Sequence, residues 1–162
     1  MKRIICLLLA LCCVLSLCAC GSTPNTPFSK LADQPDYDTV IKRYGQNYQA
    51  SENGTTSTLR YEKYKWMGNE GILDITFEEA RVKDSHNNDV IAKVVKRADW
   101  LGITHSEDES SDLESKIIDY LNKSIGNYSS LTECWTDAAG NRYFEGTERT
   151  KDFIVLVNFI PK

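Results

Sequence analysis

The stretch "GILDITFEEARV", residues 71–82, decides the fold class. Leu73, Ile75 and Phe77 alternate with the polar residues Asp74 and Thr76. This period of two predicts a strand with one buried face and one face toward water. Alternation of this kind is typical of antiparallel sheets that are covered on one side.

Further strands are predicted on both sides of this stretch, over residues 57–66, 130–136, 141–148 and 152–160. The link "DAAGN" after residue 136 has the composition of a hairpin turn. The last strand, "FIVLVNFI", is apolar in both of its alternating sets. Both faces of this strand therefore need cover, from a helix, from a second copy of the chain or from a partner.

Three segments have helical periodicity. Residues 36–48 have Asp36 as a plausible N-cap, and Gly45 is expected to end the regular turns. Residues 111–126 begin with a Ser111–Glu114 capping box and end at Gly126. Residues 88–102 favour a helix with one apolar stripe, while their β-branched content also allows a strand.

Together these elements predict an α+β fold, with helices packed on one face of an antiparallel sheet. Helical segments followed by a strand ending in tryptophan and further strands occur twice, around Trp66 and Trp135. The pattern is that of two α-β-β-β repeats.

The amino terminus predicts export and lipid attachment. A basic start at Lys2 and Arg3 precedes an apolar run over residues 4–19. "LCAC" at 17–20 resembles the bacterial lipobox, which implies a signal peptide over 1–19, cleavage before Cys20 and a lipid thioether on its thiol. An extracytoplasmic, membrane-anchored location follows, with the membrane as a partner through the lipid on Cys20.

The residues after Cys20 are rich in proline and small polar side chains, so 20–35 predict a flexible tether and 36–162 a single domain. Removal of 1–19 leaves 17 of the 19 basic residues against 23 acidic ones. An acidic domain argues against nucleic acid as a partner. Cys134 and Cys20 are then the only cysteines, so no internal disulfide is expected.

The first half also resembles small lipoproteins with a β-lactamase-inhibitor-protein-like, or SmpA/OmlA-type, repeat. That resemblance implies a helix pair on an antiparallel sheet, used for binding or envelope assembly and without catalytic residues. The matching residues are Val40, Gly45, Tyr64, Trp66, Gly71, Ile72, Ile75, Thr76, Phe77 and Val82.

Residue types that could support catalysis or metal binding are few. His86 and His105 are the only histidines, and acids at 107–109 and Asp112 follow His105. Acidic side chains before a helix are explained by the helix dipole and by solvation, so we expect neither a metal site nor a cofactor. No P-loop, GxSxG, HExxH or paired CxxC motif is present.

Tyr61, Tyr64 and Trp66 are candidate interaction residues, because strict alternation would place Tyr61 on the face opposite the other two rings. We expect at least one of these rings to lie exposed on the far side of the sheet. The sequence thus predicts a non-enzymatic binding domain with an envelope protein as partner. The alternatives are a ligand-capture lipoprotein of a transport system and an enzyme with a site near His105.

Overall fold

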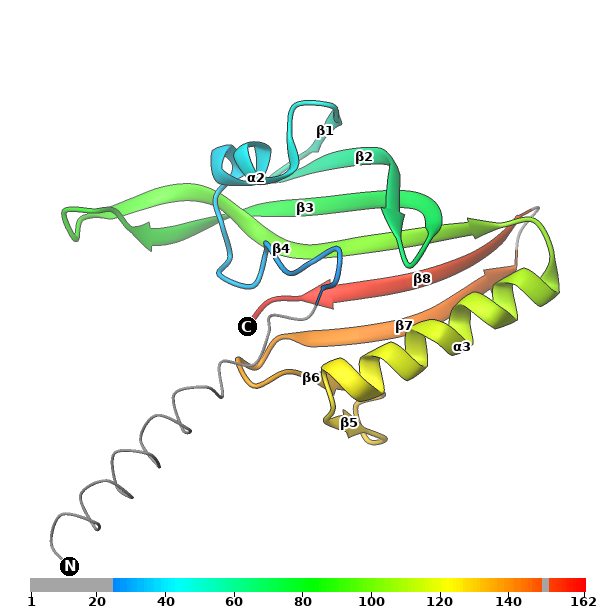
Figure 1. Ribbon diagram of the computed structural model, residues 1–162. Coiled ribbons are helices and arrows are strands. Elements are labelled where there is room, and N and C mark those ends of the chain that lie inside the picture. The colour runs from blue at the N-terminus through cyan, green and yellow to red at the C-terminus, as the bar shows by residue number, and fades with distance from the viewer. Residues whose placement is uncertain (1–24, 150–151) are drawn as a thin grey trace, which may run out of the picture.

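The protein is described by a computed structural model, which places residues 25–149 and 152–162 (Figure 1). Its described part is a single antiparallel sheet of eight strands with two helices. The helices are α2 (Tyr37–Tyr44) and α3 (Glu107–Ser124). The strands are β1 (Gln49–Asn53), β2 (Thr56–Trp66), β3 (Asn69–Lys83), β4 (Asp89–Thr104), β5 (Tyr128–Ser129), β6 (Cys134–Thr136), β7 (Arg142–Arg149) and β8 (Phe153–Ile160).

The strand order is β1-β2-β3-β4-β8-β7-β6-β5. Strands β1 to β4 and strands β5 to β8 are each neighbours in chain order, and β4 pairs with β8 where the two groups meet. Strands β3 and β4 extend beyond their other neighbours and form the long hairpin on the left of Figure 1. The predicted α+β class is confirmed, and each helix precedes four strands rather than three.

One face of the sheet, the inner face, carries the core. Register aligns Leu59, Ile75, Ala98, Phe159 and Tyr143 in one row across five strands. All five are buried, and the neighbouring row contributes Tyr61, Leu73, Trp100 and Val157. The predicted inward direction of Leu73, Ile75 and Phe77 in the stretch 71–82 is therefore confirmed.

Helix α2 begins and ends where the sequence predicts, within the longer stretch 36–48. The carboxylate of Asp36 accepts a hydrogen bond from the backbone N–H of Thr39 at 2.8 Å, as an N-cap does. Gly45 ends the helix with a φ of +95°, a conformation that glycine adopts without steric cost. The ring of Tyr37 packs on Phe77 at a centroid distance of 5.0 Å.

Helix α3 starts before the predicted Ser111. Ser106 is its N-cap and accepts from the backbone N–H of Glu109, whose carboxylate in turn accepts from the backbone N–H of His105 at 2.9 Å. These two bonds, one accepted by Ser106 and one by Glu109, take the place of the expected Ser111–Glu114 capping box. The earlier start adds a turn that buries Ser110 beside Leu113 and Ile117.

The helix favoured over 88–102 is wrong and the alternative strand is confirmed, because these residues form most of β4. An irregularity in the β3–β4 pairing explains the misleading spacing. Thr76 pairs with Arg97 but its neighbour Phe77 pairs with Val95, so Lys96 is an extra residue in β4. Val95 and Ala98 therefore both face the core although they are three residues apart, which is a helical spacing.

Two other expectations need correction. Within the expected strand 130–136, only Cys134–Thr136 is a strand. The expected tether over 20–35 is partly folded, because residues 26–33 form turns in which Phe28 and Leu31 are completely buried. The Phe28 ring stacks on Phe159 at 5.2 Å, so the folded part begins before Asp36.

Candidate functional site

The opposite face of the sheet, the outer face, carries a row of aliphatic side chains. Ile72, Leu101 and Leu156 are aligned across β3, β4 and β8, and Ile103 pairs with Ile154 one row away. None of these five is fully buried, and Ile103 is 38% exposed. The second apolar set of β8 is thus located here, while Val155, Val157 and Phe159 lie in the core.

A polar group borders the aliphatic row on the outer face. Arg60 donates two hydrogen bonds to the carboxylate of Asp74, at 2.8 and 2.7 Å. Asp99 accepts from the Asn158 amide and forms an ion pair with Arg97 at 3.2 Å. Burial raises the pKa of the Asp99 carboxyl, while the Asn158 hydrogen bond and the Arg97 charge lower it. These charges neutralise one another within the face.

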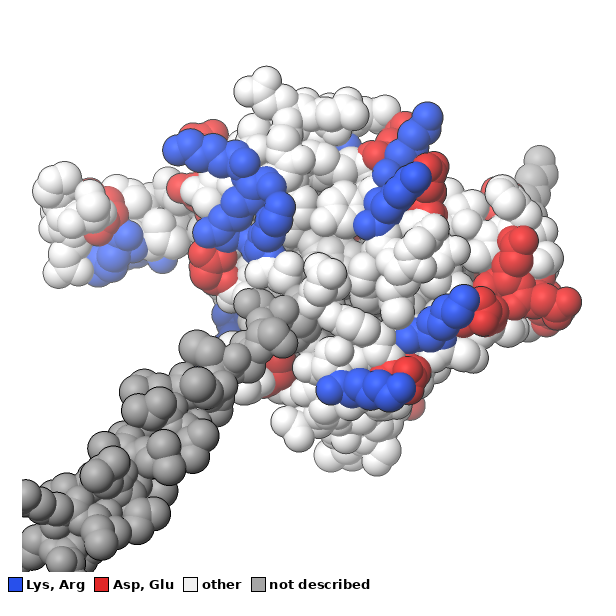
Figure 2. Space-filling view, viewed as in Figure 1, with Lys and Arg blue, Asp and Glu red and all other residues white. Residues whose placement is uncertain are grey.

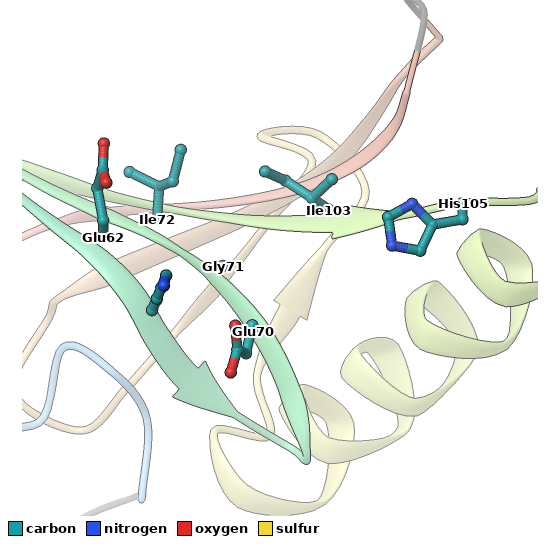
Figure 3. Close-up of a pocket in the computed structure, with 7 residues that line it drawn as sticks. Glu62, Glu70, Gly71, Ile72, Ile103 and His105 are labelled. Atoms are coloured by element: carbon teal, nitrogen blue, oxygen red, sulfur yellow. The ribbon is translucent and has the colours of Figure 1, made fainter.

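A depression of about 310 Å³ lies beside the aliphatic row (Figure 3). Ile72 and Ile103 are its apolar part, and the charged or titratable side chains Glu62, Glu70 and His105 surround them. We call it the His105 pocket; Lys63 and Gly71 complete its lining.

The His105 pocket lacks the hydrogen bonds of an acid–base site. Within residues 25–149 and 152–162, no hydrogen bond joins the His105 imidazole to Glu62 or Glu70. Glu62 accepts from Gln49, and Glu70 pairs with Lys65 at 3.3 Å. Glu107, Asp108 and Glu109 lie in the first turn of α3, and Asp112 follows in the next turn. Acidic side chains gather at the amino end of α3, on the right of Figure 2. The described residues hold no cluster of three or more His, Cys, Asp or Glu suited to a metal.

The predicted interaction residues Tyr61, Tyr64 and Trp66 all turn toward the core. Lys63 has a φ of +56°, and the β2–β3 register shifts between Tyr61 and Tyr64. This bulge places Tyr64 on the same side as Tyr61, where both rings contact Tyr44 of α2. Tyr61 and Trp66 are buried and Tyr64 is half-buried. The expectation of an exposed ring among the three is therefore wrong.

Two cysteines, Cys20 and Cys134, lie after the predicted cleavage site. Cys20 lies outside the described residues. Cys134 is buried in β6, with its sulfur 3.3 Å from the Thr132 hydroxyl. In the described part of the chain, no helix is long and apolar enough to span a membrane.

Sequence reasoning did not identify the aliphatic row of the outer face as a candidate site. Leu101 belongs to the stretch 88–102 for which a helix was favoured, Ile103 follows that stretch, and Ile72 was named only as a residue of the family resemblance. The available signal was "FIVLVNFI", whose second apolar set already required a surface of its own. Comparisons of this chain with protein-family models, with curated proteins and with solved structures find no match.

Proposed function

We propose that this protein is a lipid-anchored, extracytoplasmic binding module that docks a partner protein on the outer face of its sheet and catalyses no reaction. The observation that carries the proposal is the aliphatic row formed by Ile72, Leu101, Ile103, Ile154 and Leu156. A partly exposed apolar group bordered by polar residues is the arrangement of a protein-binding surface.

Contacts of the helices and the amino-terminal segment support an uncovered outer face. Tyr37 of α2 packs on Phe77, and Phe28 packs on Phe159, both on the inner face. Leu113 of α3 lies so close to Gly102 that a Cβ there would be 2.9 Å from its Cδ2. We infer that α2, α3 and residues 25–35 share the inner face, so that a partner is left to cover the other.

The charges of the outer face favour a protein over nucleic acid or a lipid surface. Its arginines are paired with acids, in the ion pairs Arg60–Asp74 and Arg97–Asp99. A polyanion would gain little from guanidinium groups that are already neutralised. The partner that fits is a folded protein with an apolar, weakly charged surface. It would be located in the same extracytoplasmic compartment, near the membrane.

The lipid anchor rests on the lipobox-like sequence before Cys20 and on the resemblance to small envelope lipoproteins. Mass spectrometry of the protein from native membranes should find a chain that begins at a lipid-modified Cys20. A Cys20→Ala variant should leave the membrane fraction. An unmodified amino terminus, or a Cys20→Ala protein that still fractionates with membranes, would refute this part of the proposal.

The docking surface is tested by site-specific photo-crosslinking in whole cells, with the photoreactive residue at Ile154. We expect a discrete crosslinked protein band that Ile103→Asp abolishes, because a charge next to position 154 would be buried in the interface. Leu131→Asp is the matched control, since Leu131 is 92% exposed and lies outside the aliphatic row. Equal crosslinking in the two variants, or none in the parent protein, would refute the outer face as the docking surface.

A further inference from the structure

A second pocket, of about 380 Å³, lies at the other end of the sheet between α3 and strands β5 to β7. We call it the Glu145 pocket. Its lining combines two carboxylates, two aromatic rings, one amide and one aliphatic side chain. The residues are Ile118, Asn122, Tyr128, Glu133, Trp135 and Glu145.

Glu145 is the unusual member of this lining. It pairs with Val157 across β7 and β8, so its side chain projects from the inner face toward α3. Its Oε1 atom is buried and has no hydrogen-bond partner among the described residues. Burial, together with the negative charge of Glu114 on α3, raises the pKa of Glu145 to about 7. A buried carboxylate oxygen without a donor is costly unless something supplies one.

The aromatic side of the pocket is held in place by neighbouring groups. The rings of Tyr128 and Trp135 pack at a centroid distance of 4.8 Å and an angle of 52°. The Trp135 indole N–H donates to Asn122 Oδ1 at 2.9 Å, which fixes the indole against α3. Tyr128 is half exposed and leaves one side of the pocket accessible.

The chemistry of this lining selects a cation. It includes Glu133 and Glu145 and no lysine, arginine or histidine, so an anion would be repelled. Aromatic faces attract organic cations through their quadrupoles, and a primary ammonium has three donors for carboxylate oxygens. A metal ion fits less well, because the Asn122 oxygen already accepts from Trp135 and hard cations require more oxygen ligands.

We propose that the Glu145 pocket binds an alkylammonium group, with the ammonium on Glu145 and the alkyl chain against Trp135 and Ile118. The group could be supplied by a free small amine or by a lysine side chain of a peptide, which share this chemistry. This site is independent of the outer face and of the lipid on Cys20.

The test uses NMR of the folded domain with 15N-labelled tryptophan. Butylammonium and the peptide acetyl-Gly-Lys-Gly-amide are titrated separately at constant ionic strength, up to about 100 mM because such small ligands bind at best in the millimolar range. We expect the Trp135 indole signal to shift, because Trp135 lines the pocket, while those of Trp66 and Trp100, which do not line it, stay in place. Trp135→Phe assigns the signal, and butyrate should cause no shift.

Binding should depend on pH through Glu145. The ionised fraction of a carboxyl with a pKa of about 7 rises from about a tenth at pH 6 to about nine-tenths at pH 8, so affinity should increase about fivefold or more. Glu114 of α3 and Glu133 face the same region and add to the attraction at both pH values. Glu145→Gln should weaken binding at pH 8 and remove most of this pH dependence. The matched control Glu148→Gln, on the same strand but paired with Ile154, should change neither.

The two probes distinguish the sources, since tighter binding of butylammonium indicates a free amine and tighter binding of the peptide indicates a lysine side chain. The proposal is overturned if neither probe moves the Trp135 signal, if butyrate moves it equally, or if Glu145→Gln binds as the parent protein does.

Discussion

Gly71 pairs with Gly102 across β3 and β4, and the indole ring of Trp100 occupies the space above both glycines. A Cβ on Gly71 would clash with the backbone oxygen of Leu101 and lie 2.8 Å from Cε2 of Trp100, and one on Gly102 would lie 2.5 Å from Cη2 of Trp100. Real Cβ atoms do not approach other atoms this closely. The two glycines thus create the slot in which the largest fully buried side chain of the core is packed.

Gly71→Ala and Gly102→Ala should each destabilise the fold by about 1–3 kcal/mol, because the added methyl group must displace the Trp100 ring and, at position 71, also the backbone carbonyl of Leu101. Urea unfolding followed by circular dichroism measures this change. Gly146→Ala is the control, since a Cβ there meets nothing within 4 Å. Its free energy of unfolding should stay within about 0.5 kcal/mol of the parent value. Equal stability of all three variants would show that Trp100 does not fill this slot.

The bulge at Lys63 predicts that truncating the rings it turns toward the core lowers the free energy of unfolding. Trp66 packs edge-on against Trp100 and Tyr120, and the Tyr61 hydroxyl donates to the carbonyl of Gly45 at 3.2 Å. Tyr61→Ser and Trp66→Ser should therefore each cost about 3–5 kcal/mol in urea melts, as truncation of a buried aromatic ring does.

Tyr64→Ser should cost less than either, because Tyr64 is half-buried. Leu131→Ser, at a fully solvated position, serves as the neutral control. If Tyr61→Ser or Trp66→Ser melted like the Leu131 control, the ring in question would be at the surface and the bulge would be misplaced.

The parts of the fold that could be predicted from sequence are those in which the chain keeps a regular period. Strand β3 alternates without interruption through Leu73, Ile75 and Phe77, and the stripe of Leu113, Ile117 and Leu121 continues through α3. The six apolar side chains named here all face the core, so one period suffices to assign both the element and its buried face.

Prediction failed where a strand contains an extra residue. The bulge in β4 places Lys96 and Arg97 together on the exposed side, and the bulge in β2 brings Tyr64 to the side of Tyr61. Each bulge replaces a spacing of two by a spacing of three, which a single sequence cannot distinguish from a helical turn or from a change of face.

The Glu145 pocket could not be predicted for a different reason. Its members come from α3, from the segment 128–135 and from β7, and only the tertiary fold brings them together. Within its own strand, Glu145 is an ordinary polar residue between Phe144 and Gly146.

The buried segment before α2 contributes to stability. Phe28 is fully buried between Tyr143 and Phe159, so Phe28→Ala should cost about 3–5 kcal/mol. Ser29→Ala, at the adjacent position, should change the free energy of unfolding by less than about 0.5 kcal/mol. Thermal or urea melts of the two variants measure the difference. Two variants with parent-like stability would mean that residues before Asp36 are a tether after all.

The stability of the domain should fall as the pH rises through the pKa of Glu145. The folded carboxyl has a pKa of about 7 against 4.5 for an unperturbed glutamate, so the folded state holds this proton more tightly than the unfolded chain. The stabilisation is complete below pH 4.5 and is lost as the pH rises through about 7. Because Glu145 is only partly buried, we expect a loss of about 1–2 kcal/mol.

Urea melts between pH 4.5 and 8.5 isolate this contribution when the parent protein is compared with Glu145→Gln, which cannot ionise. The difference in unfolding free energy between the two should shift by about 1–2 kcal/mol in favour of the glutamine variant as the pH rises. Glu148→Gln, an exposed glutamate on the same strand, should run parallel to the parent curve. Parallel curves for Glu145→Gln as well would show that the Glu145 carboxyl titrates normally, because its charge would then be solvated rather than buried against α3.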